Sequence, residues 1–395
     1  MISKYVFPLI LSLLALTLNG TAAEQAKPEF RAMWISSYSS DADMISPANI
    51  DRLVADAKKA NLNALIVQVR KTGDALYNSD YEPRAENLRL PDFDPLAYII
   101  EKAHVQGIEV HAWLNTYKVW EKGSFPQSPN HVFNQHPEWI SKSIAGTRDR
   151  SGQYALDPGA KPVQDFLYEI YMDVLRKYDV DGIHLDYVRY WDKSYGYSDL
   201  AVSRFNRATG RTGVPKPADP IWCEWRRDRV TDLVRQIYIG AKVIKPWVKV
   251  TAAVVASQPC PRDFRNSHPY GSLLQDWERW TREGIVDAVI PMNYKTETNA
   301  KSAKLFRDWI EGMVRWKHDR HVYNGILIQG TKSFLTQIEA SRKRGTDGVV
   351  GFAFNRGQSR PRSEMVKALA SGVFSKPAPV PEMAWKDKRS SGVVE

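Results

Sequence analysis

The chain has few of the residues that build metal or redox centres. Of its 395 residues only two are cysteines, Cys223 and Cys260, and eight are histidines. Two cysteines cannot supply the four ligands of a tetrahedral zinc site, and the first predicted strand has no His-x-His pair for a metal-dependent hydrolase. We therefore expect no metal and no other cofactor. The two cysteines can close a disulfide in an oxidising compartment, with two independent buried thiols as the alternative.

Long apolar runs are equally scarce. The exception is Val6 to Leu18, which follows Lys4 and precedes the small residues Thr21-Ala22-Ala23. This pattern is typical of a cleavable secretory signal peptide, here residues 1–23, and the run is short for a membrane span. A retained N-terminal anchor is the alternative. We expect a secreted or periplasmic protein with no transmembrane segment after signal removal.

Positive charge is in excess but is not concentrated. The formal net charge is +10, and the longest basic run is Arg226-Arg227-Asp228-Arg229, which we interpret as a solvated helix face. A run this short argues against nucleic acid as a partner. An excess of base suits an anionic surface or polymer, such as a cell wall or an acidic glycan.

What the sequence does contain is one repeated unit, a short apolar run followed by an amphipathic stretch. The apolar runs predict strands over residues 31–36, 64–70, 108–115, 182–187, 248–256, 286–293, 322–328 and 349–354. The amphipathic stretches predict helices over residues 47–60, 96–106, 161–178, 226–244, 273–283, 303–316, 333–344 and 362–370. Eight such units predict a (β/α)8 TIM barrel over residues 28–372. An open doubly wound sheet is the alternative, but no glycine-rich phosphate loop follows the first strand.

Two connections in this pattern are long. Residues 116–160 and 188–221 follow the third and fourth predicted strands and are rich in Trp, Tyr, Pro and Gly. We expect them to form the walls of an active-site cleft. Residues 373–395 contain Lys376-Pro377-Ala378-Pro379-Val380-Pro381, which predicts a Pro-rich tail that is extended and open to disorder.

A carboxylate stands at the end of the fourth predicted strand. His184 and Asp186 point to one face of this strand, and Ile183 and Leu185 point to the other. A buried carboxylate is costly unless it has partners or a task, and catalytic groups of a barrel lie at the C-terminal strand ends. Asp186 is therefore the first candidate catalytic residue. The alternative is a structural aspartate bonded to Arg189 or to backbone amides.

The other predicted strand ends are rich in aromatic, amide and basic side chains. Aromatic faces stack on sugar rings, while amides and arginines bond hydroxyl groups, so this composition predicts a carbohydrate cleft. The candidate substrate-binding residues are Arg31, Trp34, Arg70, Trp113, Asn115, Tyr117, His184, Tyr187, Arg189, Asn293, Tyr294, Gln329 and Asn355.

Cleavage of a glycosidic bond normally takes two carboxyl groups. We expect Asp186 to act as nucleophile or base. Glu297, just after the sixth predicted strand, is the candidate acid, and Asp74 and Asp263 are its competitors after the second and fifth strands. An exposed loop acid without a catalytic task is the alternative for Glu297.

Three motifs together resemble the glycosyl-hydrolase-like family 10. They are Phe30-Arg31-Ala32-Met33-Trp34-Ile35, residues 181–189, and Val286-Asp287-Ala288-Val289-Ile290-Pro291-Met292-Asn293-Tyr294, and the resemblance covers residues 28–370. It implies a (β/α)8 barrel that cleaves peptidoglycan glycan strands stripped of stem peptides, with its catalytic aspartate at Asp186. Many members have Asp-Asp-Tyr where this chain has Leu185-Asp186-Tyr187. The sequence thus predicts an exported glycoside hydrolase acting on a bacterial polysaccharide, with a non-catalytic glycan-binding barrel as the alternative.

Overall fold

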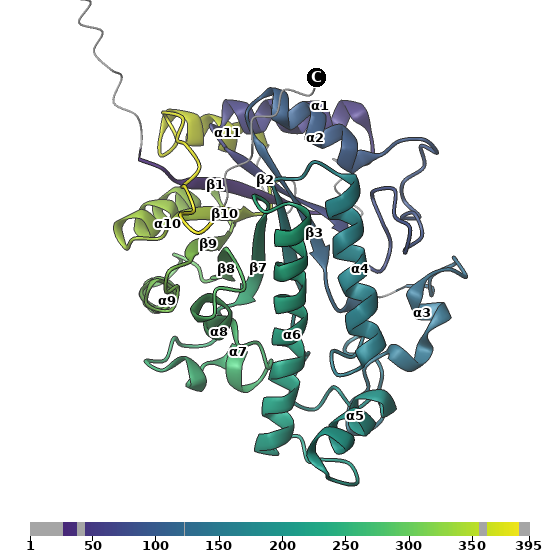
Figure 1. Cartoon of the computed structure of the whole chain (residues 1–395). Coiled ribbons are helices and arrows are strands. Elements are labelled where there is room, and N and C mark those ends of the chain that lie inside the picture. Colours follow the sequence, from purple (N-terminus) through teal and green to yellow (C-terminus); the bar gives the residue numbers. More distant parts are fainter. Residues whose placement is uncertain (1–26, 38–43, 122, 355–361, 387–395) are drawn as a thin grey trace, which may run out of the picture.

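Eight buried runs of mostly apolar residues pair as the parallel strands of a closed barrel (Figure 1). The structure is a computed structural model, and it describes residues 27–37, 44–121, 123–354 and 362–386. The predicted signal peptide and Asn355 lie outside the described residues. The barrel strands are β1 (Phe30–Ile35), β2 (Ala64–Arg70), β3 (Glu109–Asn115), β6 (Gly182–Asp186), β7 (Lys249–Val255), β8 (Ala288–Met292), β9 (His321–Leu327) and β10 (Gly348–Phe352). Neighbours in this order are hydrogen-bonded and β10 closes on β1, so the predicted (β/α)8 barrel is confirmed.

Helices return the chain from the end of one strand to the start of the next. They are α1 (Pro47–Lys59), α2 (Pro95–Val105), α4 (Lys161–Lys177), α6 (Pro220–Ile244), α8 (Trp277–Arg282), α9 (Ala300–Arg315), α10 (Thr331–Lys343) and α11 (Arg362–Ser371). Helix α6 begins earlier than predicted, because the Asp219 side chain accepts hydrogen bonds from the amides of Ile221 and Trp222 and Pro220 takes the first helical position. Among the described residues no helix combines the length and hydropathy that a bilayer crossing requires.

The long connections carry short elements of their own at the barrel mouth, the end of the barrel where the strands end. The loop after β3 contains β4 (Lys118–Trp120), α3 (Val132–Gln135), the 3-10 helix η2 (Pro137–Trp139) and β5 (Tyr154–Ala155). The loop after β6 contains α5 (Asp199–Thr209), and the loop after β7 contains η3 (Phe264–Asn266) and α7 (His268–Gly271). β4 and β5 pair as a separate antiparallel sheet.

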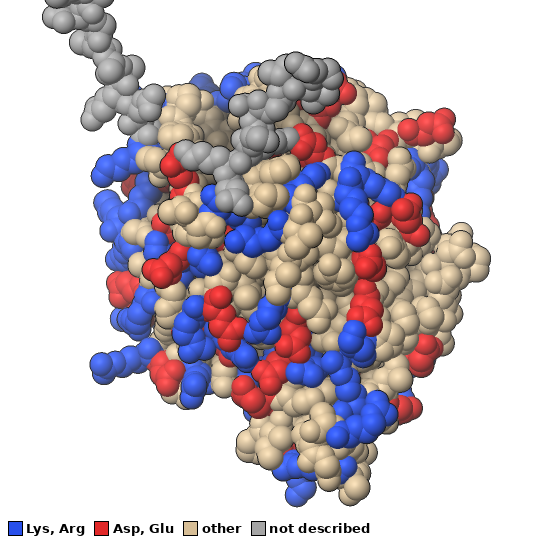
Figure 2. Space-filling view, viewed as in Figure 1, with Lys and Arg blue, Asp and Glu red and all other residues tan. Residues whose placement is uncertain are grey.

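The barrel interior is filled by one apolar cluster, and a larger one lies between the strands and the helices. Trp34, Trp113 and Tyr323 are the largest buried side chains of the interior cluster. On the face shown in Figure 2, Lys and Arg are spread widely and interleaved with Asp and Glu. The excess of positive charge is therefore not gathered into a single patch on that face.

Residues 373–386 cover the end of the barrel opposite the mouth. Phe374 is buried under the guanidinium groups of Arg31 and Arg342, at 4.6 and 5.4 Å from the ring centroid. Met383 joins the interior cluster, and Trp385 Nε1 donates to Asp287 Oδ1 (2.8 Å). These residues pack against the barrel, the expectation of a Pro-rich tail open to disorder stays a prediction, and residues 387–395 lie outside the described residues.

Candidate functional site

The barrel mouth rests on buried polar side chains. Trp34 Nε1 donates to His184 Nε2 (3.0 Å), and His184 Nδ1 lies 2.9 Å from Thr251 Oγ1. Because an indole nitrogen only donates, Nε2 of His184 accepts and Nδ1 carries the proton. Burial, with the nearby charge of His111, lowers the pKa of His184 well below its usual value. Trp34 and His184 were predicted to contact sugar, but both are buried and support the site from below.

A second set of buried hydrogen bonds fixes the ends of β2 and β3. Gln68 Oε1 accepts from the amide and hydroxyl of Ser37 (3.0 Å each), and Gln68 Nε2 donates to Asn115 Oδ1 (3.3 Å). Trp113 Nε1 also donates to Asn115 Oδ1 (3.1 Å), and Asn115 Nδ2 donates to the carbonyl of Lys71 (2.7 Å). Trp113 and Asn115 therefore hold the strand ends together and are not open to a ligand.

Asp186 is the carboxylate at the centre of the mouth. It ends β6 and is 6% exposed, and its Oδ1 accepts from the amide of Tyr187 (2.6 Å) and lies 3.6 Å from Arg189 Nη1. Burial raises the pKa of Asp186, against the lowering effects of the Arg189 charge, the Tyr187 amide and the charge of Lys118. The carboxyl group therefore holds its proton to a higher pH than an exposed aspartate does.

Two cations flank the ring of Tyr187. Its backbone adopts a φ of 49°, and its ring centroid lies 4.7 Å from Arg189 Cζ and 5.0 Å from Lys118 Nζ. Trp191 packs against the same ring edge to face, at 5.8 Å between centroids. Such cation–π contacts orient both cations, so the predicted pair Tyr187 and Arg189 does lie beside Asp186.

Lys118 and Glu121 were not predicted from the sequence. Lys118 is buried on β4, and its Nζ lies 2.6 Å from Glu121 Oε2, while Glu121 Oε1 lies 3.3 Å from Lys71 Nζ. Burial acts to raise the pKa of Glu121, but the hydrogen bond and charge of Lys118 and the charge of Lys71 outweigh it and lower the pKa. Glu121 is therefore an ionised carboxylate near Asp186, connected to it through Lys118.

The opposite side of the site is formed by β8 and β10. Tyr294 stacks on Phe352, with 5.7 Å between ring centroids and an interplanar angle of 16°. Burial and the negative charge of Asp186 raise the pKa of Tyr294 well above its usual value, so its hydroxyl stays neutral beside that carboxyl group. Asn293 is fully buried and donates to the Phe306 carbonyl (2.9 Å), so it anchors α9 and does not reach into the mouth.

The predicted acid Glu297 is engaged with α9. Its Oε2 lies 3.3 Å from Arg307 Nη2, and its side chain is 15% exposed. The contacts that the structure describes for Glu297 do not include Asp186, and its catalytic role stays a prediction. Of its competitors, Asp74 accepts hydrogen bonds from Thr72 and Asp263 caps η3.

Four other predicted sugar ligands lie at the opposite end of the barrel, are enclosed by the protein, or are exposed on a loop. Arg31 is the second residue of β1, at the opposite end of the barrel, where its Nε donates to Glu29 (2.7 Å). Arg70 is enclosed with Glu82 in an ion pair of 2.7 Å whose side chains are 1% and 0% exposed. Tyr117 is buried, and Gln329 is exposed on the loop after β9. The structure therefore does not bring Arg31, Arg70 or Tyr117 to a ligand.

The predicted disulfide does not form. Both cysteines are free thiols: Cys223 Sγ donates to the Pro217 carbonyl (3.2 Å), and Cys260 Sγ lies 3.7 Å from the Pro261 carbonyl. Burial raises the pKa of Cys260 to about 11, so this thiol stays protonated at neutral pH. The disulfide prediction is therefore wrong, because each sulfur is packed among its own neighbours.

Solved structures share this fold. The chain is similar to the PgaB (BpsB) glycoside hydrolase domain from Bordetella bronchiseptica, with a TM-score of 0.60, 14% identity and coverage of 87% of this chain and 99% of that one. It is also similar to Gan42B, a GH42 β-galactosidase from G. stearothermophilus, with a TM-score of 0.62, 12% identity and coverage of 88% and 57%. At such identities the likeness shows the TIM-barrel fold alone.

Relatives with curated descriptions are similar in sequence. Glycosyl hydrolase YngK of Bacillus subtilis is 28% identical over 98% of this chain and 80% of its own length. Glycosyl hydrolase DigH of Escherichia coli is 29% identical over 68% of this chain, and the match spans 62% of DigH. The family model described as glycosyl hydrolase-like 10 matches residues 29–334. The chain therefore belongs to the glycosyl hydrolase-like 10 family.

Proposed function

We propose that this protein is an exported glycoside hydrolase that cleaves glycosidic bonds in a bacterial polysaccharide. The observation that carries the proposal is the buried carboxyl group of Asp186 at the end of β6, beside Tyr187, Arg189 and Tyr294. Aromatic, basic and hydroxyl groups around one carboxyl group suit a sugar ring at its reacting carbon. Family membership supports an activity on glycans.

The electrostatics favour Asp186 as the proton donor, and not as the base that the sequence predicted. A general acid in glycoside cleavage needs a raised pKa so that it is protonated when the leaving group departs. Burial raises the pKa of Asp186, which supports this role. The ionised Glu121 is then a candidate for the second carboxyl group, with Glu297 as the other candidate.

The proposals of export and of a polysaccharide substrate in the cell envelope rest on the sequence. The signal-peptide pattern over residues 1–23 supports export to the periplasm or the medium. The net charge of +10 suits an anionic envelope. Peptidoglycan glycan strands stripped of stem peptides are the first substrate to test.

The experiment is release of reducing ends from a panel of purified polysaccharides, including denuded peptidoglycan, intact sacculi and chitin. We expect Asp186→Asn to lower the rate by at least ~10³-fold, on the scale of a removed catalytic group, with little change in melting temperature. Asp199→Asn is a matched control, because the Asp199 side chain is 92% exposed in the first turn of α5. Near-normal turnover by Asp186→Asn would reject the assignment.

A glycan-binding barrel without catalysis is the second candidate. It is favoured by one observation, which is that Glu121 and Glu297 are both engaged by basic side chains. Binding to a polysaccharide that the protein never cleaves, with equal affinity in Asp186→Asn, would establish this candidate in place of the first.

A further inference from the structure

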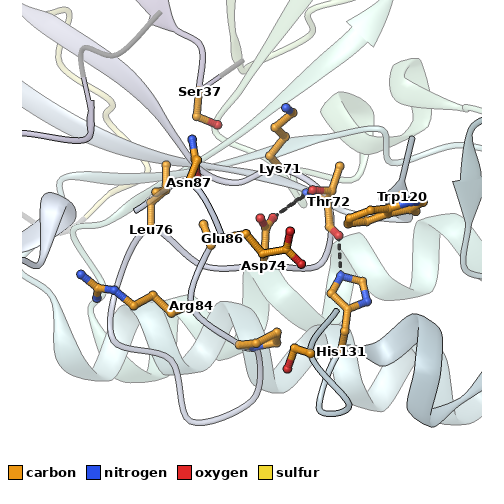
Figure 3. Close-up of a pocket in the computed structure, with 13 residues that line it drawn as sticks. Ser37, Lys71, Thr72, Asp74, Leu76, Arg84, Glu86, Asn87, Trp120 and His131 are labelled. Carbon is orange, nitrogen blue, oxygen red and sulfur yellow. Dashed lines mark hydrogen bonds between the residues drawn. The ribbon is translucent and has the colours of Figure 1, made fainter. Parts of the chain in front are cut away.

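We propose that a pocket beside the end of β2 binds one neutral sugar ring of a glycan that extends from Asp186 (Figure 3). The inference rests on the proposed function only in taking the ligand to be a glycan. The pocket has a volume of about 160 Å³, which suits a single ring better than an extended chain. The residues that line it include Lys71, Asp74, Glu86, Trp120 and His131.

The pocket adjoins the candidate catalytic centre through a chain of ion pairs. Lys71 lines the pocket and its Nζ lies 3.3 Å from Glu121 Oε1. Glu121 Oε2 lies 2.6 Å from Lys118 Nζ, and the charge of Lys118 acts on Asp186. A glycan with one sugar at Asp186 can therefore continue over Glu121 and place a further sugar in the pocket.

The wall of the pocket is held in a fixed shape. His131 is buried, its Nε2 lies 2.7 Å from the Thr72 carbonyl, and its Nδ1 accepts from the Phe133 amide (3.1 Å). The Trp120 ring packs edge to face on His131, with 5.5 Å between ring centroids. The backbone of Gly73 packs closely against the imidazole ring of His131. Gly73 has a φ of 78°, and a Cβ there would lie 2.8 Å from His131 Nε2. Because these contacts fix the His131 imidazole, the Trp120 ring that packs on it is oriented before any ligand binds.

Three polar atoms of residues that line the pocket have no hydrogen-bond partner among the described residues. Asp74 Oδ1 accepts from the amide and hydroxyl of Thr72 (3.0 and 3.1 Å), and Glu86 Oε1 accepts from the Gln127 amide (3.0 Å). Within the described part of the chain no hydrogen bond reaches Asp74 Oδ2 or Glu86 Oε2, and the buried Trp120 Nε1 has no partner. Two acceptors and one donor beside an indole match the hydroxyl groups and apolar face of a sugar ring.

The charges that line the pocket balance one another. Lys71 and Arg84 oppose Asp74 and Glu86. Burial lowers the pKa of His131, against the hydrogen bond to Thr72 and nearby carboxylates, so the imidazole stays neutral. Of the two cations, Lys71 pairs with Glu121, while Arg84 donates to backbone carbonyls. A pocket without net charge, whose open oxygens only accept, selects a neutral hexose or N-acetylhexosamine over an acidic sugar.

The direct test is the indole N–H resonance of Trp120 in isotope-labelled full-length Asp186→Asn protein, which cannot consume the ligand. The probes are N-acetylglucosamine and its neutral β-1,4-linked oligomers. We expect the Trp120 resonance to shift saturably with the longer oligomers. Trp120→Phe keeps the ring but lacks the donor, and Asp74→Asn lacks one charged acceptor, so each should weaken binding of long oligomers by about three- to ten-fold. Trp139→Phe is the matched control, because Trp139 lies on the same long loop in η2.

The outcomes separate this pocket from the proposed function. If the wild-type protein cleaves a glycan but no oligomer shifts the Trp120 resonance, the pocket proposal is overturned and the hydrolase proposal stands. If the resonance shifts while the wild type releases no reducing ends from any polysaccharide, the hydrolase proposal fails and the pocket stands. Equal affinity for oligomers of glucuronic acid would overturn the selection of a neutral sugar.

Discussion

Replacement of Lys386 by methionine tests whether residues 373–386 close the barrel. The Lys386 ammonium lies 2.8 Å from Asp287 Oδ2, and the two side chains are 6% and 0% exposed. The change removes this cation and its bond to the Val248 carbonyl. It leaves the Asp287 carboxylate buried with the N–H groups of Trp385 (2.8 Å) and Val250 (2.7 Å).

The magnitude follows from the burial of the pair. Removing one partner of a buried ion pair costs about 3–5 kcal/mol, because the remaining charge loses its compensation. Two N–H donors still reach Asp287, so we expect a loss at the lower end, about 3 kcal/mol. Burial also lowers the pKa of Lys386, against the raising effect of Asp287, which shows that the ammonium is itself poorly solvated. The double variant Lys386→Met/Asp287→Asn should therefore lose at least about 1 kcal/mol less than the sum of the single changes.

The assay is urea unfolding followed by tryptophan fluorescence, from which the free energy of unfolding is extrapolated to water. The matched control is Lys367→Met, at an exposed lysine on α11. Release of reducing ends by the folded variant should be unchanged, since Lys386 lies at the end of the barrel opposite Asp186. Surface substitutions usually change the free energy of unfolding by less than about 0.5 kcal/mol. A change this small for Lys386→Met would show that the ion pair does not hold residues 373–386 on the barrel.

Three further predictions concern the site and the surface. Asp186→Asn should slow the cleavage of glycosides with poor leaving groups far more than that of activated aryl glycosides. For the wild type, kcat/KM should fall as pH rises through the raised pKa of Asp186. Equal losses of rate on both kinds of substrate would contradict the acid role. Burial lowers the pKa of Lys295 to about 7, so the native state loses this proton at a lower pH than the unfolded state does. The free energy of unfolding should therefore rise with pH above about 7. Lys295→Met should flatten this rise between pH 6 and 9, and an unchanged slope would refute the assignment. Binding to isolated wall sacculi should be weaker in 1 M salt, where the Debye length is ~3 Å, than in low salt. Cleavage of short neutral oligosaccharides should not depend on salt in this way. Wall binding that does not change with salt would show that the net charge does not contribute to binding.

The sequence predicted the barrel because each strand is buried on both sides. In β2 all seven residues are buried and five of them are apolar, so the run stands out from its polar flanks. The start of α6 was harder to predict. Trp222 and Trp225 pack with Phe205 in a small separate cluster, and this partnership joins two loop segments that show no common periodicity. The capping residues Asp219 and Pro220 were the available signal.

Composition did not predict how residues 373–386 pack against the barrel. Their prolines indicate an extended chain, and the chain is extended, but Phe374, Met383 and Trp385 are spaced along it as side chains that the barrel end can receive. Whether an extended segment is ordered depends on a complementary surface, and that surface is built from strand starts far away in the sequence. Arg31 shows the same limit, because it shares its partner Glu29 with Arg342, which comes from a distant part of the sequence.

Residues of the site could be predicted only where they follow one another at the end of a single strand. Asp186, Tyr187 and Arg189 follow one another at the end of β6, so a single motif located all three. Lys118 and Glu121 lie in a long loop without periodicity, and only the pairing of β4 with β5 places them. No local pattern in the sequence marks such a pair.

The roles of the carboxyl groups follow from this geometry. Two acids of a glycosidase must differ in protonation at the same pH, and their surroundings decide which one keeps the proton. Asp186 is buried with a single cation at 3.6 Å, whereas the Glu121 side chain is 26% exposed and lies between two lysines at 2.6 and 3.3 Å. Burial raises the pKa of Asp186, whereas the two lysines lower the pKa of Glu121, which supports the proposal that Asp186 is the acid and Glu121 the ionised group. Lys118 serves both groups, because its ammonium holds Glu121 ionised while its charge limits how far the pKa of Asp186 can rise.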